Sequence, residues 1–184
     1  TLLRHLDDDI SRRFNQIARD RFDVRIANAS KLEKTDNGVR LKLDNGESVE
    51  AEAILVATGR TPNGDQMDVD KAGIELLADG RVSTDEFGRT TAEGVWALGD
   101  VSSPYMLKHV ANAEARTVQH NLLHSEDLRP LPHDNVPAAI FTHPQIATVG
   151  LTEKQAREKG FDVTVKVQKF GDVAYGWAME DSTG

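Results

Sequence analysis

A short apolar run that ends in glycine and aspartate constrains the fold of this chain most. The run is Val95–Leu98, and Gly99 and Asp100 follow it directly. An apolar run of this length between turn residues predicts a buried strand, which places Asp100 at the carboxyl edge of a sheet. Ligands of α/β proteins bind at that edge, where glycine allows close approach to the backbone and a carboxylate accepts hydrogen bonds from a polyol.

Turn residues divide the first third of the chain into short strands. Two Asn-Gly pairs separate three segments, which are Lys31–Thr35, Val39–Leu43 and Glu47–Ala51. Asn-Gly is a strong hairpin signal because both positions tolerate positive φ, so the segments predict an antiparallel three-stranded meander. The apolar run Ala53–Ala57 predicts a further strand, buried on both faces.

Two longer helices and several shorter elements complete the expected secondary structure. Acidic residues followed by apolar residues at helical spacing predict one helix over residues 8–21, and an apolar stripe predicts another over Leu107–Leu123. The stripe expected on the second helix consists of Ala111, Ala115, Val118 and Leu122. Further strands are expected at Val24–Ile26, Ala138–Phe141, Ile146–Val149 and Phe161–Phe170, with a short helix over 152–159.

Composition argues against several functional classes. The 184 residues carry a net charge of −8, which disfavours a nucleic-acid or anionic-membrane partner, and no apolar run approaches the roughly 20 residues that span a bilayer. Cysteine is absent, which rules out a disulfide framework or a thiol nucleophile in this chain. We therefore expect a cytoplasmic location. Both ends resemble cuts through a longer protein, so the chain is expected to be a central-to-C-terminal piece.

Three segments resemble motifs of the FAD-dependent pyridine nucleotide–disulfide reductases, in the order and spacing of that family. Residues 54–63 are similar to the strand and turn that leave the nicotinamide domain, residues 91–101 to the second flavin motif, and residues 136–153 to the opening of the dimerisation domain. Within the family, the resemblance is greatest to the mycothione reductases, followed by the glutathione reductases and dihydrolipoamide dehydrogenases. The resemblance implies hydride transfer from NADPH or NADH to FAD, and then electron transfer to a cysteine pair.

The same resemblance implies an α/β protein, α+β overall, built from three partial domains. Residues 1–59 would form the second part of an NAD(P)-binding domain, and residues 60–128 the second part of an FAD-binding domain with the three-stranded meander nearby. Residues 129–184 would form the truncated first part of an α+β dimerisation domain. The family's glycine-rich loops, cysteine pair and catalytic His–Glu segment have no counterpart here, so no catalytic residue is expected and the chain alone is expected to be inactive.

On the flavin side, Asp100 matches the family aspartate that hydrogen-bonds the ribityl chain, and Gly99 allows close backbone approach beside it. In the family, the helix that follows this motif points its N-terminus at the pyrimidine edge of the flavin. The residues at the start of the corresponding helix here are Met106, Leu107, Lys108 and His109. Met106 would also lie near the nicotinamide. The alternatives are a helix-capping role for Asp100 and an ordinary surface or core histidine at His109.

On the nicotinamide side, Arg4 matches an arginine that contacts the 2′-phosphate of NADPH. Arginine suits this role because its planar guanidinium binds phosphate through two hydrogen bonds, which makes NADPH the expected reductant over NADH. Gly59 matches a backbone site beside the dinucleotide, and Ala139 a position near the nicotinamide. The alternative for Arg4 is a solvated surface arginine.

Three histidines are not interpreted as site residues. His120 and His124 have the i, i+4 spacing of paired metal ligands, but no third ligand is evident and a solvated helix face is the preferred interpretation. His143 is followed by proline, as is the family's catalytic histidine, but that histidine belongs to a later segment, so His143 is interpreted as structural. No metal is expected.

The leading hypothesis is therefore part of a homodimeric FAD-dependent oxidoreductase that uses NADPH to reduce a small mycothione-like disulfide. Within the enzyme class, a dihydrolipoamide dehydrogenase, a glutathione reductase or a thiol-free NADH oxidase stays open. The rival from another class is a non-catalytic dimerisation or nucleotide-binding module on a reductase-derived scaffold.

Overall fold

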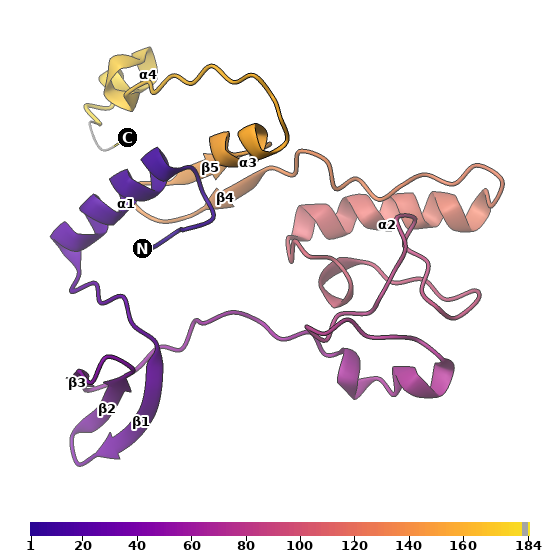
Figure 1. The fold of residues 1–184 in the computed structure, drawn as a ribbon, viewed down its shortest axis with the longest axis horizontal. Helices are drawn as coiled ribbons and strands as arrows, with labels where there is room; N and C mark the ends of the chain where they lie inside the picture. Colours follow the sequence, from indigo (N-terminus) through magenta and orange to yellow (C-terminus); the bar gives the residue numbers. More distant parts are fainter. Residues whose placement is uncertain (182–183) are drawn as a thin grey trace. The chain divides into compact units, whose positions relative to one another are not determined.

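The computed structural model describes all residues of the chain except 182 and 183. It forms two compact units, which are described separately (Figure 1). The first unit consists of Thr1–Ala57 and Pro137–Gly184, and the second of Thr58–Val136. The elements are mixed helices and small antiparallel sheets, as the α+β fold class requires. The three partial domains expected from the sequence stay a prediction.

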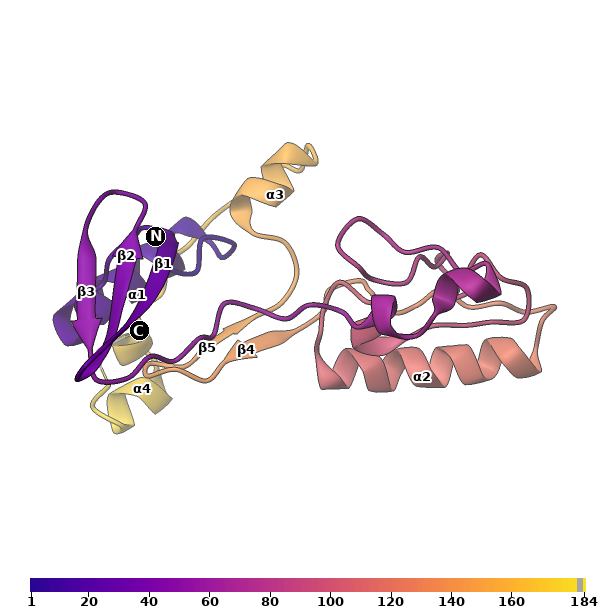
Figure 2. The same cartoon turned by 90° about the horizontal axis from the view of Figure 1, so that it is seen from below.

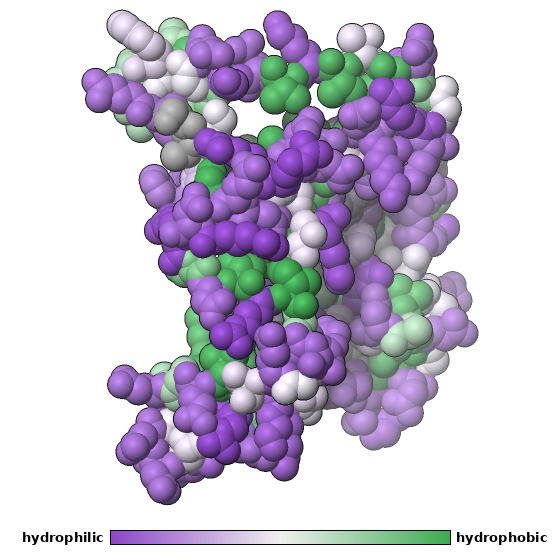
Figure 3. Space-filling view, turned by 60° about the vertical axis from the view of Figure 1, so that its left-hand side comes forward, coloured by the Kyte–Doolittle hydropathy of each residue, from purple (hydrophilic) through white to green (hydrophobic). Residues whose placement is uncertain are grey.

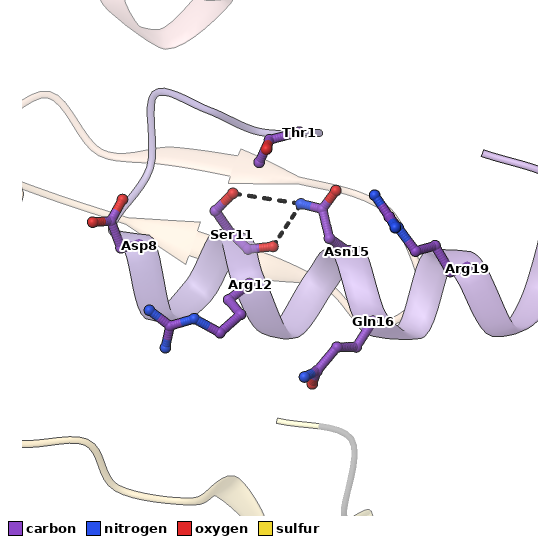
Figure 4. A pocket seen from close by; sticks show the side chains of 7 residues that line it. All are labelled: Thr1, Asp8, Ser11, Arg12, Asn15, Gln16 and Arg19. Atoms are coloured by element: carbon purple, nitrogen blue, oxygen red, sulfur yellow. Dashed lines mark hydrogen bonds between the residues drawn. The ribbon is translucent and has the colours of Figure 1, made fainter. Parts of the chain in front are cut away.

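The first unit opens with the predicted helix, α1 (Asp8–Arg21). Its first turn carries two aspartates and its last turn two arginines, a distribution that complements the helix dipole. A polar side of α1 fixes the N-terminal segment: Asn15 Oδ1 accepts from the Leu2 N–H at 2.9 Å, and the Ser11 hydroxyl donates to the Leu2 carbonyl at 2.9 Å. These two buried side chains lie at the pocket shown in Figure 4.

The predicted meander is confirmed. It comprises β1 (Ala29–Thr35), β2 (Gly38–Leu43) and β3 (Ser48–Ala51), which pair antiparallel in the order β1-β2-β3 (Figure 2). Leu32 pairs with Leu41, and Leu41 pairs with Val49 on the other side. Gly38 is required by geometry, because its φ is +152° and a side chain there would collide with the Ala51 backbone.

The C-terminal part of the first unit contains the predicted hairpin and capped helix. The strands β4 (Ala138–Ile140) and β5 (Ile146–Thr148) pair antiparallel, and α3 (Glu153–Glu158) follows them. Thr152 and Gln155 form a capping box at the start of α3. The short helices η4 (Phe170–Asp172) and α4 (Ala174–Ala178) end the unit.

The second unit is organised around one helix, α2 (Lys108–Leu123). Three single-turn helices precede it, η1 (Gly64–Gln66), η2 (Val69–Ala72) and η3 (Gly99–Val101). The remaining segments are loops joined by isolated bridges between Leu76 and Val82 and between Arg89 and Trp96, and they lie along α2 (Figures 1 and 2). The apolar core of the unit is small and consists of Val69, Val82, Val110 and Val118.

Four of the predicted strands are wrong. Residues 24–26, 53–57 and 161–169 are irregular, Phe170 begins η4, and Val95–Leu98 makes only the one bridge at Trp96. The physical reason is pairing: a strand is stabilised by its neighbours, and no strand among the residues described pairs with these segments. Leu55 and Val56, expected in a buried strand, are 89% and 69% exposed.

The predicted stripe on α2 is also wrong in part. The buried positions are Val110, Glu114, Val118 and Asn121, whereas Leu122 is 57% exposed. The buried face follows helical spacing, but two of its four members are polar, so an apolar pattern alone could not locate it. Both polar side chains are fully buried and hydrogen-bonded.

Apolar side chains are exposed in both units. Among the largest are Phe141, Tyr175 and Trp177, at 85%, 68% and 76% exposure. Figure 3 shows green apolar residues at several places on an otherwise purple, hydrophilic face. Within the described part of the chain, no helix has the length and apolar composition needed to cross a membrane.

Asn121 supplies a test of how the second unit is held together. Its amide donates to the Phe87 and Arg129 carbonyls at 3.1 and 2.8 Å and accepts from the Arg129 N–H at 2.8 Å. Asn121→Ala leaves these partly buried backbone groups without the amide as partner and should lower the free energy of unfolding by about 1–3 kcal/mol. Urea unfolding of the chain measures the change. Asn112→Ala, at an exposed position of α2, should change stability by less than about 0.5 kcal/mol; equal losses would contradict the assignment.

Candidate functional site: the turn before α2

The Gly99-Asp100 motif lies in the single-turn helix η3 and not at the end of a strand, which corrects the sequence expectation. Gly99 has φ of +70°, a conformation that favours glycine, and it lies close to Ala111 of α2. The Gly99 carbonyl accepts from the backbone N–H groups of Ser102 and Ser103, at 3.0 and 2.7 Å. The turn is therefore closed upon its own backbone.

The Asp100 carboxylate is accessible. Its side chain is 44% exposed, and Arg60 Nη1 lies 3.2 Å from Asp100 Oδ2. Arg60 is itself 70% exposed, so solvent screens this ion pair and it contributes little to stability. Arg60 belongs to a segment that resembles a family motif, but no pattern in the sequence pairs it with Asp100.

A buried carboxylate holds the turn from the side of α2. Glu114 is fully buried; its Oε2 accepts from the Gly99 N–H at 2.6 Å, and its Oε1 lies 2.6 Å from His133 Nε2. Burial alone would raise the pKa of Glu114, but hydrogen bonds from His133, Gly99 and Ser103 outweigh it and hold the pKa below its ordinary value. The Glu114 carboxylate is thus stabilised in its charged form.

His133 is fixed from both sides. Its ring meets Tyr105 edge-on at 5.1 Å between centroids, and the Tyr105 hydroxyl donates to the His133 carbonyl at 3.0 Å. The segment after α2 is therefore tied both to the buried Glu114 carboxylate and to the loop that enters the helix. Sequence reasoning missed Glu114 and His133; the available clue was the position of Glu114 four residues from both Val110 and Val118.

The N-terminus of α2 has an unusual entry. Met106 adopts φ of +45°, and Leu107, in an extended conformation, is the N-cap residue. No side chain caps the helix, and its first turn, all of which is described, carries no acidic residue. Lys108 and His109 are exposed on that turn. The turn η3 packs on the N-terminal half of α2, where Gly99 lies beside Ala111 and donates to Glu114.

The nicotinamide-side residues are distributed over both units. Arg4 is exposed in the turn before α1, and Ala139 is exposed on β4, where it pairs with Ala147; both belong to the first unit. Gly59 belongs to the second unit and has φ of +121°, and a Cβ added there would meet no atom within 4 Å. Neither unit by itself brings the three together.

A polar pocket of about 400 Å³ lies along α1 (Figure 4). It is lined by Thr1, Asp8, Ser11, Arg12, Asn15, Gln16 and Arg19. None of the predicted site residues is among these. Its buried polar atoms, on Ser11 and Asn15, are already bonded to Leu2, so they are not free to receive a ligand.

The two histidines at the C-terminal end of α2, His120 and the C-cap residue His124, have a local structural role. The rings of His120 and His124 lie 4.7 Å apart, and His120 Nε2 lies 2.9 Å from the Asp127 carbonyl. Over the residues that the structure describes, no group of three His, Cys, Asp or Glu side chains could hold a metal ion. His143 is exposed, and its carbonyl accepts from Arg21 at 2.8 Å.

Comparison with known proteins defines the class. A family described as pyridine nucleotide-disulphide oxidoreductase matches residues 1–115, and the dimerisation domain of the same family matches residues 136–184. The chain belongs to the pyridine nucleotide-disulphide oxidoreductase family. The resemblance seen in the sequence motifs is thereby confirmed.

The chain is also similar to individual proteins of this family. The chain is 55% identical over its whole length to the mycothione reductase of Mycobacterium tuberculosis strain H37Rv, of which it covers 41%. It is 38% identical to the dihydrolipoyl dehydrogenase of Halobacterium salinarum, over 89% of this chain and 35% of that protein. It thus spans 41% of the mycothione reductase and 35% of the dihydrolipoyl dehydrogenase, less than half of either protein.

Solved structures share the fold. The flavoprotein disulfide reductase RclA from Escherichia coli superposes with a TM-score of 0.87 at 29% identity, over 99% of this chain and 42% of RclA. LpdA from Mycobacterium tuberculosis superposes with a TM-score of 0.84 at 25% identity, over 97% of this chain and 39% of LpdA. The mixed α/β fold expected from the sequence is confirmed.

The pKa of Glu114 sets a direction for acid stability. A carboxyl whose pKa is lowered on folding contributes stability that is present above its unfolded pKa, about 4.3, and is lost as the pH falls through the folded value. Unfolding free energy measured between pH 7 and pH 3 should therefore fall on acidification. In Glu114→Gln this component should be missing, so the pH profile becomes shallower; superimposable profiles would contradict the assignment.

Proposed function

We propose that this chain is part of an FAD-dependent, NADPH-using oxidoreductase that reduces a low-molecular-weight disulfide of the mycothione type. The observation that carries the proposal is the exposed Asp100 carboxylate, which follows Gly99 in a turn packed against the N-terminal half of α2, a helix whose start no side chain caps. Membership of the family supports the cofactor class.

The residues of this turn fit the flavin. The exposed Asp100 carboxylate can accept hydrogen bonds from the hydroxyls of the ribityl chain. The N–H groups at the start of α2, near Leu107 and Lys108, favour negative charge on the pyrimidine edge of the ring. When bound, FAD supplies the hydride and electron transfer, and the chain's own residues bind and orient it.

The reduction of a disulfide needs groups that this chain does not contain. It has no cysteine, so the redox pair of the family must come from elsewhere in a longer protein. We therefore predict that the purified 184-residue chain, with FAD and NADPH added, shows no disulfide reduction above the rate of free FAD. Disulfide-dependent NADPH oxidation by the chain alone would contradict this; the chain without FAD is the control.

The substrate assignment rests on similarity. The mycothione reductase of Mycobacterium tuberculosis supports a mycothione-like disulfide. Two further relatives support alternative activities, namely the dihydrolipoyl dehydrogenase of Halobacterium salinarum at 38% identity and the glutathione reductase of Burkholderia cepacia at 31% identity. A non-catalytic dimerisation or nucleotide-binding module is the alternative from another class. The cytoplasmic location stays a prediction.

A homodimer is also proposed. Residues 136–184 match the family's dimerisation domain, and this region exposes large apolar side chains, among them Phe141 and Trp177. Exposed apolar side chains favour association with a second surface, which supports a second copy of the protein as the partner.

Asp100 provides the direct test of the flavin assignment. In the longer protein that we propose contains this chain, Asp100→Asn should weaken FAD binding about tenfold or more, because a charged acceptor is replaced by a neutral one. Titration of the apoprotein with FAD measures the dissociation constant. Asp134→Asn, at an exposed carboxylate of the same unit, is the matched control; equal dissociation constants for all three proteins would contradict the role of Asp100.

Arg4 provides the test of reductant choice. Arg4→Gln in the longer protein should raise KM for NADPH about tenfold and leave KM for NADH nearly unchanged, because only NADPH carries the 2′-phosphate. Steady-state kinetics with the two nucleotides measure both. Arg19→Gln, an exposed arginine of α1, serves as control. Equal effects on NADPH and NADH, or wild-type turnover that is as fast with NADH, would overturn the assignment.

A further inference from the structure

We infer that Glu114 is a positioning residue for the flavin site: from inside the second unit it holds the Gly99 turn that presents Asp100. The inference rests on the proposed function and deepens it. Glu114 belongs to the middle of α2, has no exposed surface, and is not among the residues that the sequence motifs single out.

Both polar backbone groups of Gly99 are engaged. Its N–H donates to Glu114 Oε2 at 2.6 Å, and its carbonyl accepts from Ser102 and Ser103. The Ser103 hydroxyl also hydrogen-bonds the Glu114 carboxylate. The first and last residues of this turn are thus attached to the same buried carboxylate, so the turn cannot shift without breaking a charge-assisted hydrogen bond.

The direction of Asp100 follows from that attachment. Asp100 is the residue after Gly99, and its partly exposed side chain forms an ion pair with the exposed Arg60. An exposed ion pair constrains a side chain weakly, so the backbone at Gly99 sets where the carboxylate points. Binding groups must be held close to their working geometry, and small displacements cost affinity.

The two carboxylate oxygens of Glu114 have different partners. Oε2 serves the Gly99 turn, whereas Oε1 serves His133 in the segment after α2. An amide at this position offers one acceptor oxygen in place of two, and that oxygen is neutral. Glu114→Gln keeps the size of the side chain and weakens the hold on Gly99, on His133 or on both.

Asn121 offers a matched control on the same helix face. Like Glu114 it is fully buried and polar, and its hydrogen bonds run to Phe87 and Arg129. None of these partners belongs to the turn at residues 99–103. Loss of Asn121 therefore destabilises the unit without touching the group that orients Asp100.

The experiment compares FAD affinity with stability in the longer protein. Wild type, Glu114→Gln and Asn121→Ala are each titrated with FAD as apoproteins, and their urea unfolding midpoints are measured without FAD. Glu114→Gln should weaken FAD binding about tenfold, whereas Asn121→Ala, though at least as destabilised, should bind FAD within about twofold of wild type. Unchanged affinity in Glu114→Gln, or equal weakening in both variants, would overturn the inference.

A second measurement needs no variant and no cofactor. Hydrogen exchange of the Gly99 amide in the wild-type apoprotein should be slow at pH 7, because the buried carboxylate accepts its proton. Exchange at the rate of an open loop would contradict the inference. This test applies even if Glu114→Gln does not fold.

The outcomes separate the inference from the proposed function. Failure of wild-type protein to bind FAD contradicts the proposed function itself, whereas weakened binding in Asp100→Asn but not in Glu114→Gln contradicts the inference alone.

Discussion

The hydrogen bonds of the Glu114 carboxylate are the interaction on which the second unit most depends. The unit has four buried valines as its apolar core and long loops in place of a sheet, so polar contacts must fix its backbone. Glu114 joins the turn before α2 to the segment after it, through Gly99 and His133. An unpaired buried charge is costly, but both carboxylate oxygens of Glu114 are hydrogen-bonded. The carboxylate therefore holds the two loops in place.

The groups that remain exposed beside this carboxylate are the ones that the proposed function uses. The backbone of Gly99 is committed inward, while the Asp100 carboxylate and the uncapped start of α2 remain accessible. A polyol acceptor in a turn that packs on a helix with an uncapped positive end suits a cofactor with a hydroxylated chain and an electron-accepting ring, which is the chemistry of the family to which the chain belongs. This chain contains no cysteine, so under the proposed function its contribution is to bind and orient the cofactor.

The sequence predicted the elements whose stability is local. The Asn-Gly turns of the meander, the charged ends of α1 and the capping box at Thr152 each act within a few residues, and the structure confirms these elements. Strands predicted at Ala53–Ala57 and Val95–Leu98 depend on neighbours, and the described chain supplies them no ladder. The motif residues Gly99 and Asp100 could be chosen from the sequence. The helical spacing of Glu114 from Val110 and Val118 indicates only its buried position, and the roles of Arg60, Glu114 and His133 depend on distant contacts that no sequence pattern shows.

A crystal structure of the longer protein with FAD tests the central claim most directly. The account predicts that a ribityl hydroxyl lies within about 3.2 Å of an Asp100 carboxylate oxygen, while the Gly99 N–H still donates to Glu114. FAD bound with its ribityl chain away from Asp100, or a Gly99 N–H that no longer meets Glu114, would contradict it.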